Sequence, residues 1–225
     1  MGITLGFLCL ICFLLLAAKI ITRRCHLERM DRILMKLHKP VSGLFFVLCF
    51  LHIIFVSPVL RNRSAAVLIT GIVSVVLMLL LICLCHMIKD KGKRMWWHRA
   101  LTLLMVIGIA SHIVTYVIDF KAYQQKIAGI AFEDIDLTEI EDGVYIGEYD
   151  AGYIYAKVEV EIKDGEIIAV NLLEHRNERG ESAESILDDV VANQKIDVDT
   201  VSGATNSSNV IKKAIEEAIR KEIIE

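Results

Sequence analysis

Four long apolar stretches limit what this chain can fold into. They lie at about residues 3–21, 41–60, 65–88 and 99–119. Each reaches the roughly 20 residues that a helix needs to cross the ~30 Å hydrocarbon core of a membrane. The residues after 119 instead alternate short apolar and charged segments, as water-soluble domains do. We therefore expect a multi-domain chain in which a four-helix all-α transmembrane bundle precedes a small soluble α+β domain.

The predicted domains are a transmembrane domain at residues 1–120, a connector at 121–138 and a soluble domain at 139–225. In the soluble domain, glycine turns separate segments of alternating hydrophobicity, which predicts at least three strands. Two amphipathic helices should follow them. The expected elements are strands over 144–149, 154–162 and from the next turn through 173, and helices over about 182–193 and 207–223.

Charge divides the chain in the same place. Residues 1–119 carry 14 Lys and Arg against 4 Asp and Glu, whereas the rest carries 11 against 24. The basic residues of the first part gather between the first and second apolar stretches and between the third and fourth. The positive-inside rule therefore predicts that these two loops are cytoplasmic and that the N-terminus and the soluble domain lie outside the cytoplasmic membrane. Membrane topology accounts for the basic residues, so we expect no nucleic-acid partner.

The first apolar stretch has the length of a signal peptide, but its flanks differ. No basic region precedes it, no small-residue cleavage site follows it, and a basic cluster comes after it. We expect a retained membrane anchor.

Four histidines repeat one spacing in the second and fourth apolar stretches. His38 and His52 are 14 residues apart, and so are His98 and His112. On an α-helix, this separation is about 21 Å along the axis and about 40° short of four full turns, so both histidines of a helix face nearly the same way. Because both helices are predicted to run outwards, His38 should lie level with His98 and His52 with His112. Two such imidazole pairs are the ligands that two six-coordinate haems require.

This pattern resembles the ferric-reductase-like transmembrane family, which includes the membrane domains of NADPH oxidases. The resemblance implies two b-type haems, with iron bound by His38 and His98 in one and by His52 and His112 in the other. The chain departs from the family in having four spans where six are usual. Two alternatives stay open, namely a different bis-histidine cytochrome and purely structural histidines at the interface and between helices.

The most specific string in the sequence runs from Asp199 to Ser208 and reads Asp-Thr-Val-Ser-Gly-Ala-Thr-Asn-Ser-Ser. It directly precedes the last predicted helix. A loop with glycine at a helix N-terminus offers free N–H groups and the positive end of the helix dipole to a phosphate. The alternative is an ordinary turn with a cap from Ser207 or Ser208. Thr205 has neither an adjacent base nor a free N-terminus, so we expect no hydrolase and predict no catalytic residue.

The string closely resembles the Ser-Gly-Ala-Thr motif of the FMN-binding domain family, found in the covalent-flavin subunits of the Rnf and sodium-pumping NADH:quinone oxidoreductase complexes. The resemblance implies FMN on Thr205, through a phosphoester made by a separate flavin transferase. It spans roughly residues 142–220, although Arg176–Gly180 lacks the Thr-Pro-Gly often found there. The further FMN contacts that it implies are Gly152, Tyr153, His175, Ser202, Gly203, Ala204, Ser207 and Ser208.

The two predicted cofactor sites together indicate an electron carrier. Electrons would pass from a cytoplasmic or quinol donor through two haems to FMN, and then to ferric iron, a small organic oxidant or a partner protein outside. The sequence has no Gly-x-Gly-x-x-Gly fingerprint for NAD(P)H, so the donor should be a separate dehydrogenase or a quinol. The alternatives are a membrane-anchored FMN carrier or docking module without haem, and a haem sensor or assembly protein.

Overall fold

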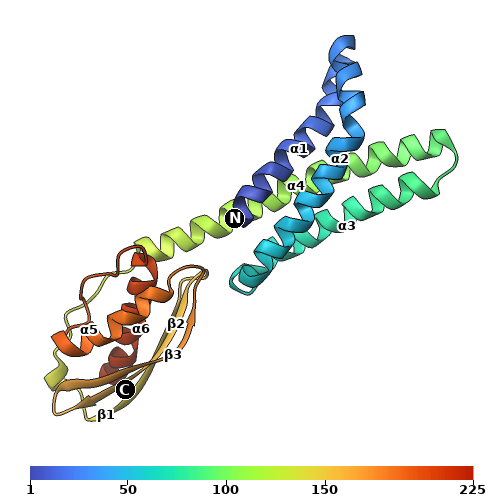
Figure 1. The fold of residues 1–225 in the computed structure, drawn as a ribbon. Helices are drawn as coiled ribbons and strands as arrows, with labels where there is room; N and C mark the ends of the chain where they lie inside the picture. The colour runs from blue at the N-terminus through green and yellow to red at the C-terminus, as the bar shows by residue number, and fades with distance from the viewer. Residues whose placement is uncertain (225) are drawn as a thin grey trace. The chain divides into compact units, whose positions relative to one another are not determined.

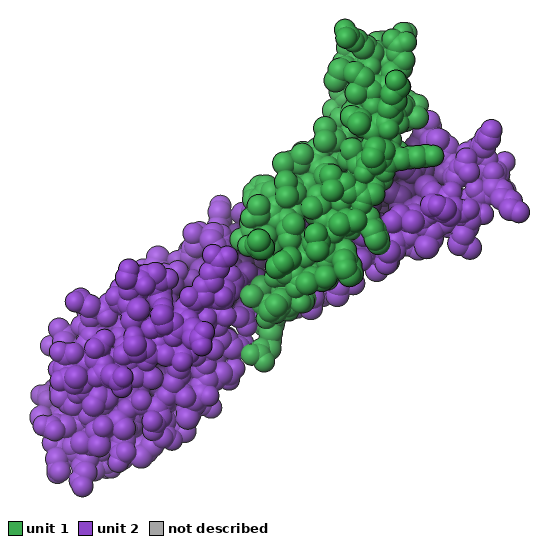
Figure 2. Space-filling model, viewed as in Figure 1, with its two compact units in different colours: residues 1–61 green, residues 62–225 purple. Residues whose placement is uncertain are grey.

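The computed structural model describes the backbone of residues 1–224 and the side chains of residues 1–220. The chain divides into two compact units, residues 1–61 and residues 62–225, which Figure 2 draws in different colours. The first unit is a pair of helices. The second contains another pair of helices and the whole α+β domain (Figure 1).

In the first unit, α1 (Gly2–Arg24) packs along α2 (Glu28–Val56), and the short 3-10 helix η1 (Ser57–Asn62) follows. The predicted second span began at residue 41, but α2 begins 13 residues earlier, at Glu28. The added segment is rich in Arg, Lys, Leu and Met, which all favour helix, and Pro40 lies inside the helix without ending it. Part of the predicted cytoplasmic loop is therefore helical.

In the second unit, α3 (Ala65–Met87) packs along α4 (Lys91–Ala128). The carboxylate of Asp90 caps α4 by accepting a hydrogen bond from the backbone N–H of Lys93 at 2.7 Å. The predicted fourth span ended at residue 119, yet α4 continues to Ala128, because the residues that follow are good helix formers until Gly129. The beginning of the predicted connector is thus the last part of α4.

All four of these helices are long and apolar enough to cross a membrane. The chain is therefore a multi-pass membrane protein, as its sequence predicts.

The soluble domain is α+β, also as predicted. Its three strands form one antiparallel sheet in the order β1-β2-β3, and the last helix lies across one face of it (Figure 1). The helix predicted over 182–193 is divided into a 3-10 turn and an α-helix. The elements are η2 (Leu137–Glu139), β1 (Gly143–Asp150), β2 (Tyr155–Lys163), β3 (Glu166–Arg176), η3 (Glu181–Ser185), α5 (Ile186–Asn193) and α6 (Thr205–Ile224).

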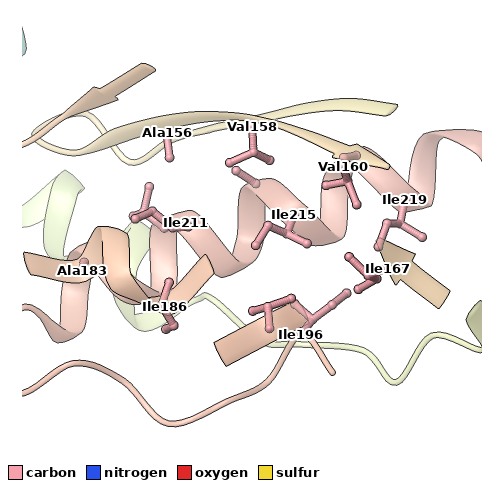
Figure 3. Close-up of a cluster of buried hydrophobic side chains, with 14 of the residues drawn as sticks. Ala156, Val158, Val160, Ile167, Ala183, Ile186, Ile196, Ile211, Ile215 and Ile219 are labelled. Atoms are coloured by element: carbon pink, nitrogen blue, oxygen red, sulfur yellow. The ribbon is translucent and has the colours of Figure 1, made fainter. Parts of the chain in front are cut away.

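The core of this domain forms where α6 meets the sheet (Figure 3). Helix α6 contributes isoleucines every four residues, which places them on one face, and β2 contributes every second residue to the same core. The side chains involved are fully buried. They are Ile211, Ile215 and Ile219 from α6, and Ala156, Val158 and Val160 from β2.

Gly147 lets β1 come close to α6. A Cβ atom at this position would lie 2.2 Å from the carbonyl oxygen of Ala214 and 2.3 Å from the backbone nitrogen of Ala218. Both are helix backbone atoms, which cannot rotate away. The contact therefore requires glycine, and it sets the separation between helix and strand.

We predict that Gly147→Ala lowers the free energy of opening of β1 and α6 by about 1–3 kcal/mol, as overpacking of a filled core does. Hydrogen exchange of the detergent-solubilised chain measures this energy for each element. Val144→Ala on the same strand is the control, because Val144 is 57% exposed and should cost little. Equal protection in Gly147→Ala and Val144→Ala would contradict the close approach.

Candidate functional site

The predicted flavin attachment residue is the first residue of α6. The preceding turn is closed by a 3.0 Å hydrogen bond from the backbone N–H of Ala204 to the carbonyl of Val201. Gly203 has a φ of +80°, in the left-handed region that favours glycine, and no atom of the described residues lies within 4 Å of where its Cβ would be. Thr205 is exposed. Its hydroxyl is therefore presented beside the first N–H groups of a helix, which have no partner within the helix.

Two serines near the start of α6 hold this turn. The hydroxyl of Ser208 accepts a hydrogen bond from the N–H of Val201 at 3.1 Å and donates one to the carbonyl of Ala204 at 3.2 Å. Ser207 is only 2% exposed, because it packs against Gly180. A Cβ at Gly180 would lie 1.9 Å from Ser207 Oγ. The two serines therefore anchor the start of α6 to its surroundings from the inside.

The segment after β3 comes close to the start of α6 at Gly180, which packs against Ser207. Asn177 Oδ1 accepts the N–H of Gly180 at 2.8 Å, which closes the loop. His175 is buried, with 2% of its side chain exposed, and its Nδ1 lies 2.9 Å from Glu184 Oε1. Its Nε2 is also buried and has no hydrogen-bond partner among the described side chains and backbone. The side chain of His175 is thus held inside the domain and does not project from its surface.

Gly152 and Tyr153 form the turn between β1 and β2. Gly152 has a φ of +96°, and its N–H donates to Asp150 Oδ1 at 2.7 Å. The Tyr153 ring is 6% exposed and stacks on the ring of Tyr123 from α4, with centroids 4.8 Å apart. The Tyr123 hydroxyl in turn accepts a hydrogen bond from Asn206 Nδ2 at 2.9 Å. Tyr153 is therefore linked through Tyr123 to the neighbour of Thr205.

Arg63 is a residue of this region that the sequence did not reveal. Its guanidinium lies 3.5 Å from the centre of the Tyr153 ring and forms an ion pair with Glu178. Burial raises the pKa of Tyr153, the guanidinium of Arg63 opposes this rise, and the carboxylate of Asp119 adds to it. In the sequence, Arg63 was only a loop charge, because its partners lie about 90 and 115 positions further along the chain. The aromatic residues of α4 did leave a signal, since positions 116, 120 and 123 fall on one helical face.

His52 packs directly on a glycine of the same helix pair. A Cβ at Gly6 would lie 3.2 Å from His52 Cε1. His52 Nδ1 is 2.8 Å from the carbonyl oxygen of Gly2, and it must be the donor because a carbonyl can only accept. The neutral ring then has its lone pair on Nε2, which is the arrangement of a metal-binding histidine whose other nitrogen is held by the protein.

His112 repeats this arrangement in the second unit. A Cβ at Gly71 would lie 3.2 Å from His112 Cε1. His112 Nδ1 is 3.2 Å from Thr70 Oγ1, a hydroxyl that also lies 2.8 Å from the carbonyl oxygen of Ala66. The glycine partners were not predicted, although small residues in apolar helices are a known sign of close packing.

The other two histidines also follow a common pattern. The hydroxyls of Ser42 and Thr102, each four residues later, donate to the carbonyls of His38 and His98 at 2.6 and 2.7 Å. Each predicted haem pair takes one histidine from each unit, so the pairing stays a prediction. Among the described side chains of residues 1–220, no group of three or more His, Cys, Asp or Glu is arranged to hold a metal ion, whereas a bis-histidine haem takes two.

Comparison with known proteins places the flavin motif in a family. Residues 151–220 match the FMN-binding domain family. The matched segment contains the turns at Gly152 and Gly203, the residue His175, and the start of α6 with Thr205. It leaves the four apolar helices outside. No curated protein and no solved structure matches the chain.

The geometry fits the FMN-binding domain. The exposed Thr205, the glycine turn and the first N–H groups of α6 together suit a phosphate group. The predicted contacts Ser202, Gly203 and Ala204 lie in that turn, and Ser207 and Ser208 fix its position. These five residues and Thr205 therefore lie together at one end of α6.

We predict that Gly180→Ala lowers the FMN bound per chain, because its Cβ would push the loop away from Ser207 and disturb the start of α6. The φ of Gly180 is −101°, so alanine is not excluded by its backbone. Gly43→Ala in α2 is the matched control, because a Cβ there meets no atom of the described residues within 4 Å, and it should keep its FMN. Flavin absorbance per chain after purification measures both variants. Full FMN content in Gly180→Ala would contradict this contact.

Proposed function

We propose that this chain transfers electrons outwards across the cytoplasmic membrane, from a cytoplasmic dehydrogenase or a quinol, through two b-type haems to FMN on Thr205. Ferric iron, a small organic oxidant or a partner protein outside accepts them. The N-terminus and the FMN-binding domain lie outside, in keeping with the positive-inside rule. Such cofactors perform the redox chemistry, and the protein binds, orients and tunes them.

The observation that carries this proposal is a row of aromatic rings along α4. It begins at Tyr116, one turn after His112, and continues through Phe120 to Tyr123, with successive ring centroids 6.2 and 6.1 Å apart. Tyr123 then hydrogen-bonds Asn206, the neighbour of Thr205. One helix thus connects a proposed haem ligand to the proposed flavin attachment site through packed side chains.

The histidines support the haem part of the proposal. In both His52 and His112, an oxygen atom lies at hydrogen-bonding distance from Nδ1, and the ring packs on a glycine. Merely structural histidines have no need for the same arrangement in two helix pairs. Polar side chains within membrane spans are costly, so their repetition favours a function.

A membrane-anchored FMN carrier without haem is the second candidate. The observation that favours it is the extent of the family match, which covers residues 151–220 and none of the four long helices. In that case the helices would serve as an anchor, and the electrons would come from another protein.

We predict that Thr205→Val abolishes acid-stable flavin when the full chain is produced together with a flavin transferase. A phosphoester needs the threonine hydroxyl, which valine lacks while keeping its shape. Thr200→Val in the same loop is the control and should retain the flavin. Flavin fluorescence of the denatured protein in a gel measures the linkage. Acid-stable flavin in Thr205→Val would contradict attachment at this residue.

We predict that the purified chain contains about two b-type haems and that the double variant His52→Ala, His112→Ala loses one of them. His86→Ala is the control, since His86 is exposed and its Nδ1 only returns to the carbonyl of Ile82. Pyridine haemochrome spectra before and after dithionite give the haem content. If wild type binds flavin but no haem, the second candidate replaces the first.

A further inference from the structure

A group of polar atoms beside the proposed flavin site is not explained by attachment of FMN to Thr205. The side chains come from the loop before α3, from the outer part of α4 and from the β1–β2 turn. We call Arg63, Asp119, Tyr123 and Tyr153 the Arg63 cluster. All four lie within the unit formed by residues 62–225.

Three atoms of the Arg63 cluster are buried without a hydrogen bond of normal geometry among the described residues: Arg63 Nη1, Asp119 Oδ2 and the Tyr153 hydroxyl. The last two face each other, since the carboxylate of Asp119 is close enough to the Tyr153 hydroxyl to raise its pKa. The Arg63 side chain is only 7% exposed, so its charge is largely removed from water. An unpaired buried polar atom costs roughly 1–3 kcal/mol, and more when the group is charged. Three such atoms in one cluster indicate a ligand with several polar atoms along one edge.

These atoms have complementary chemistry. Arg63 Nη1 can only donate, Asp119 Oδ2 accepts when ionised, and the Tyr153 hydroxyl can donate. The pyrimidine edge of a flavin ring carries the opposite groups, namely two carbonyls and an N–H. Two donors and one acceptor are the set that such an edge requires.

The cluster also lies where the ring of an attached flavin would reach. Asn206, next to Thr205, contacts Tyr123, and Tyr123 stacks on Tyr153. The ribityl chain of FMN separates the ring from the phosphate, so the ring has to lie some distance from Thr205. The half-buried ring of Tyr123 offers an aromatic surface along this path.

We infer that the Arg63 cluster binds the pyrimidine edge of the FMN ring and sets its reduction potential. The inference rests on the proposed attachment of FMN to Thr205 and adds residues from outside the matched segment 151–220. Because the three atoms are covered, a side chain must move aside for the ring. Glu178 is suited to this, since its side chain is 37% exposed and an ion pair with an exposed partner is weak.

The charges of the cluster predict opposite effects on the flavin. Reduction adds negative charge to the flavin ring, so a nearby positive charge favours the reduced form and a nearby negative charge disfavours it. We predict that Arg63→Gln shifts the flavin midpoint potential downwards and that Asp119→Asn shifts it upwards. Arg63→Lys keeps the charge and should lie nearer to wild type. A merely structural defect has no reason to act with opposite signs.

The experiment is a spectroelectrochemical titration of the flavin in the full chain, with acid-stable flavin measured in each variant. Arg220→Gln is the control, because Arg220 forms an exposed ion pair with Glu133 elsewhere in the domain. Should Asp119→Asn fail to fold, Glu178→Gln is expected to give the same upward shift. Unchanged potentials in flavin-bearing Arg63→Gln and Asp119→Asn, or shifts of the same sign, would overturn the inference.

A second measurement separates this inference from the attachment itself. Free FMN is titrated into Thr205→Val, and its binding is followed by flavin fluorescence. We expect saturable binding that Arg63→Gln weakens by about tenfold or more, the value of a hydrogen bond from a charged group. If the wild-type chain carries no acid-stable flavin, only the attachment to Thr205 is contradicted. If Thr205→Val binds free FMN equally well with and without Arg63→Gln, binding of the flavin ring by the Arg63 cluster is contradicted.

Discussion

The packing of α6 against the sheet is the contact on which the candidate site depends. Three isoleucines of α6 are fully buried against β2, and Gly147 brings β1 to within backbone contact of the same helix. The helix axis is therefore fixed along its length. Thr205 is its first residue, so a rigid element presents this hydroxyl. Sites carried on such elements are held more accurately than sites within loops.

Local patterns in the sequence were sufficient to predict the three strands and the last helix of this domain. Alternating apolar residues placed the strands to within a few residues, and the spacing of isoleucines placed α6. The end of α4 was predicted too early, because hydropathy marks where a span leaves the membrane and not where its helix ends. Helix propensity in Lys121–Ala128 carries the helix onwards, and it is a weaker signal than a run of apolar residues.

The contacts that complete the site lie beyond such patterns. Gly180 meets Ser207 across 27 positions, and Arg63 meets Glu178 across 115, so no local periodicity links them. The same holds for Gly6 and Gly71, which lie under His52 and His112. The histidine spacing was visible in the sequence because both members lie on one helix. Their packing partners lie on the preceding helix, and only the folded pairs reveal them.

The position of Arg63 bears on why these contacts exist at all. A buried charge is seldom the most stable choice, since well-packed apolar side chains of similar volume often stabilise a protein equally well or better. The Arg63 guanidinium is nevertheless buried on an aromatic ring, paired only with the more exposed Glu178, and its Nη1 atom has no partner among the described residues. Stability gives little reason for that arrangement. The flavin ring that we infer beside Arg63 supplies a reason, because a charge held at a fixed place acts through space on the potential of a nearby redox group.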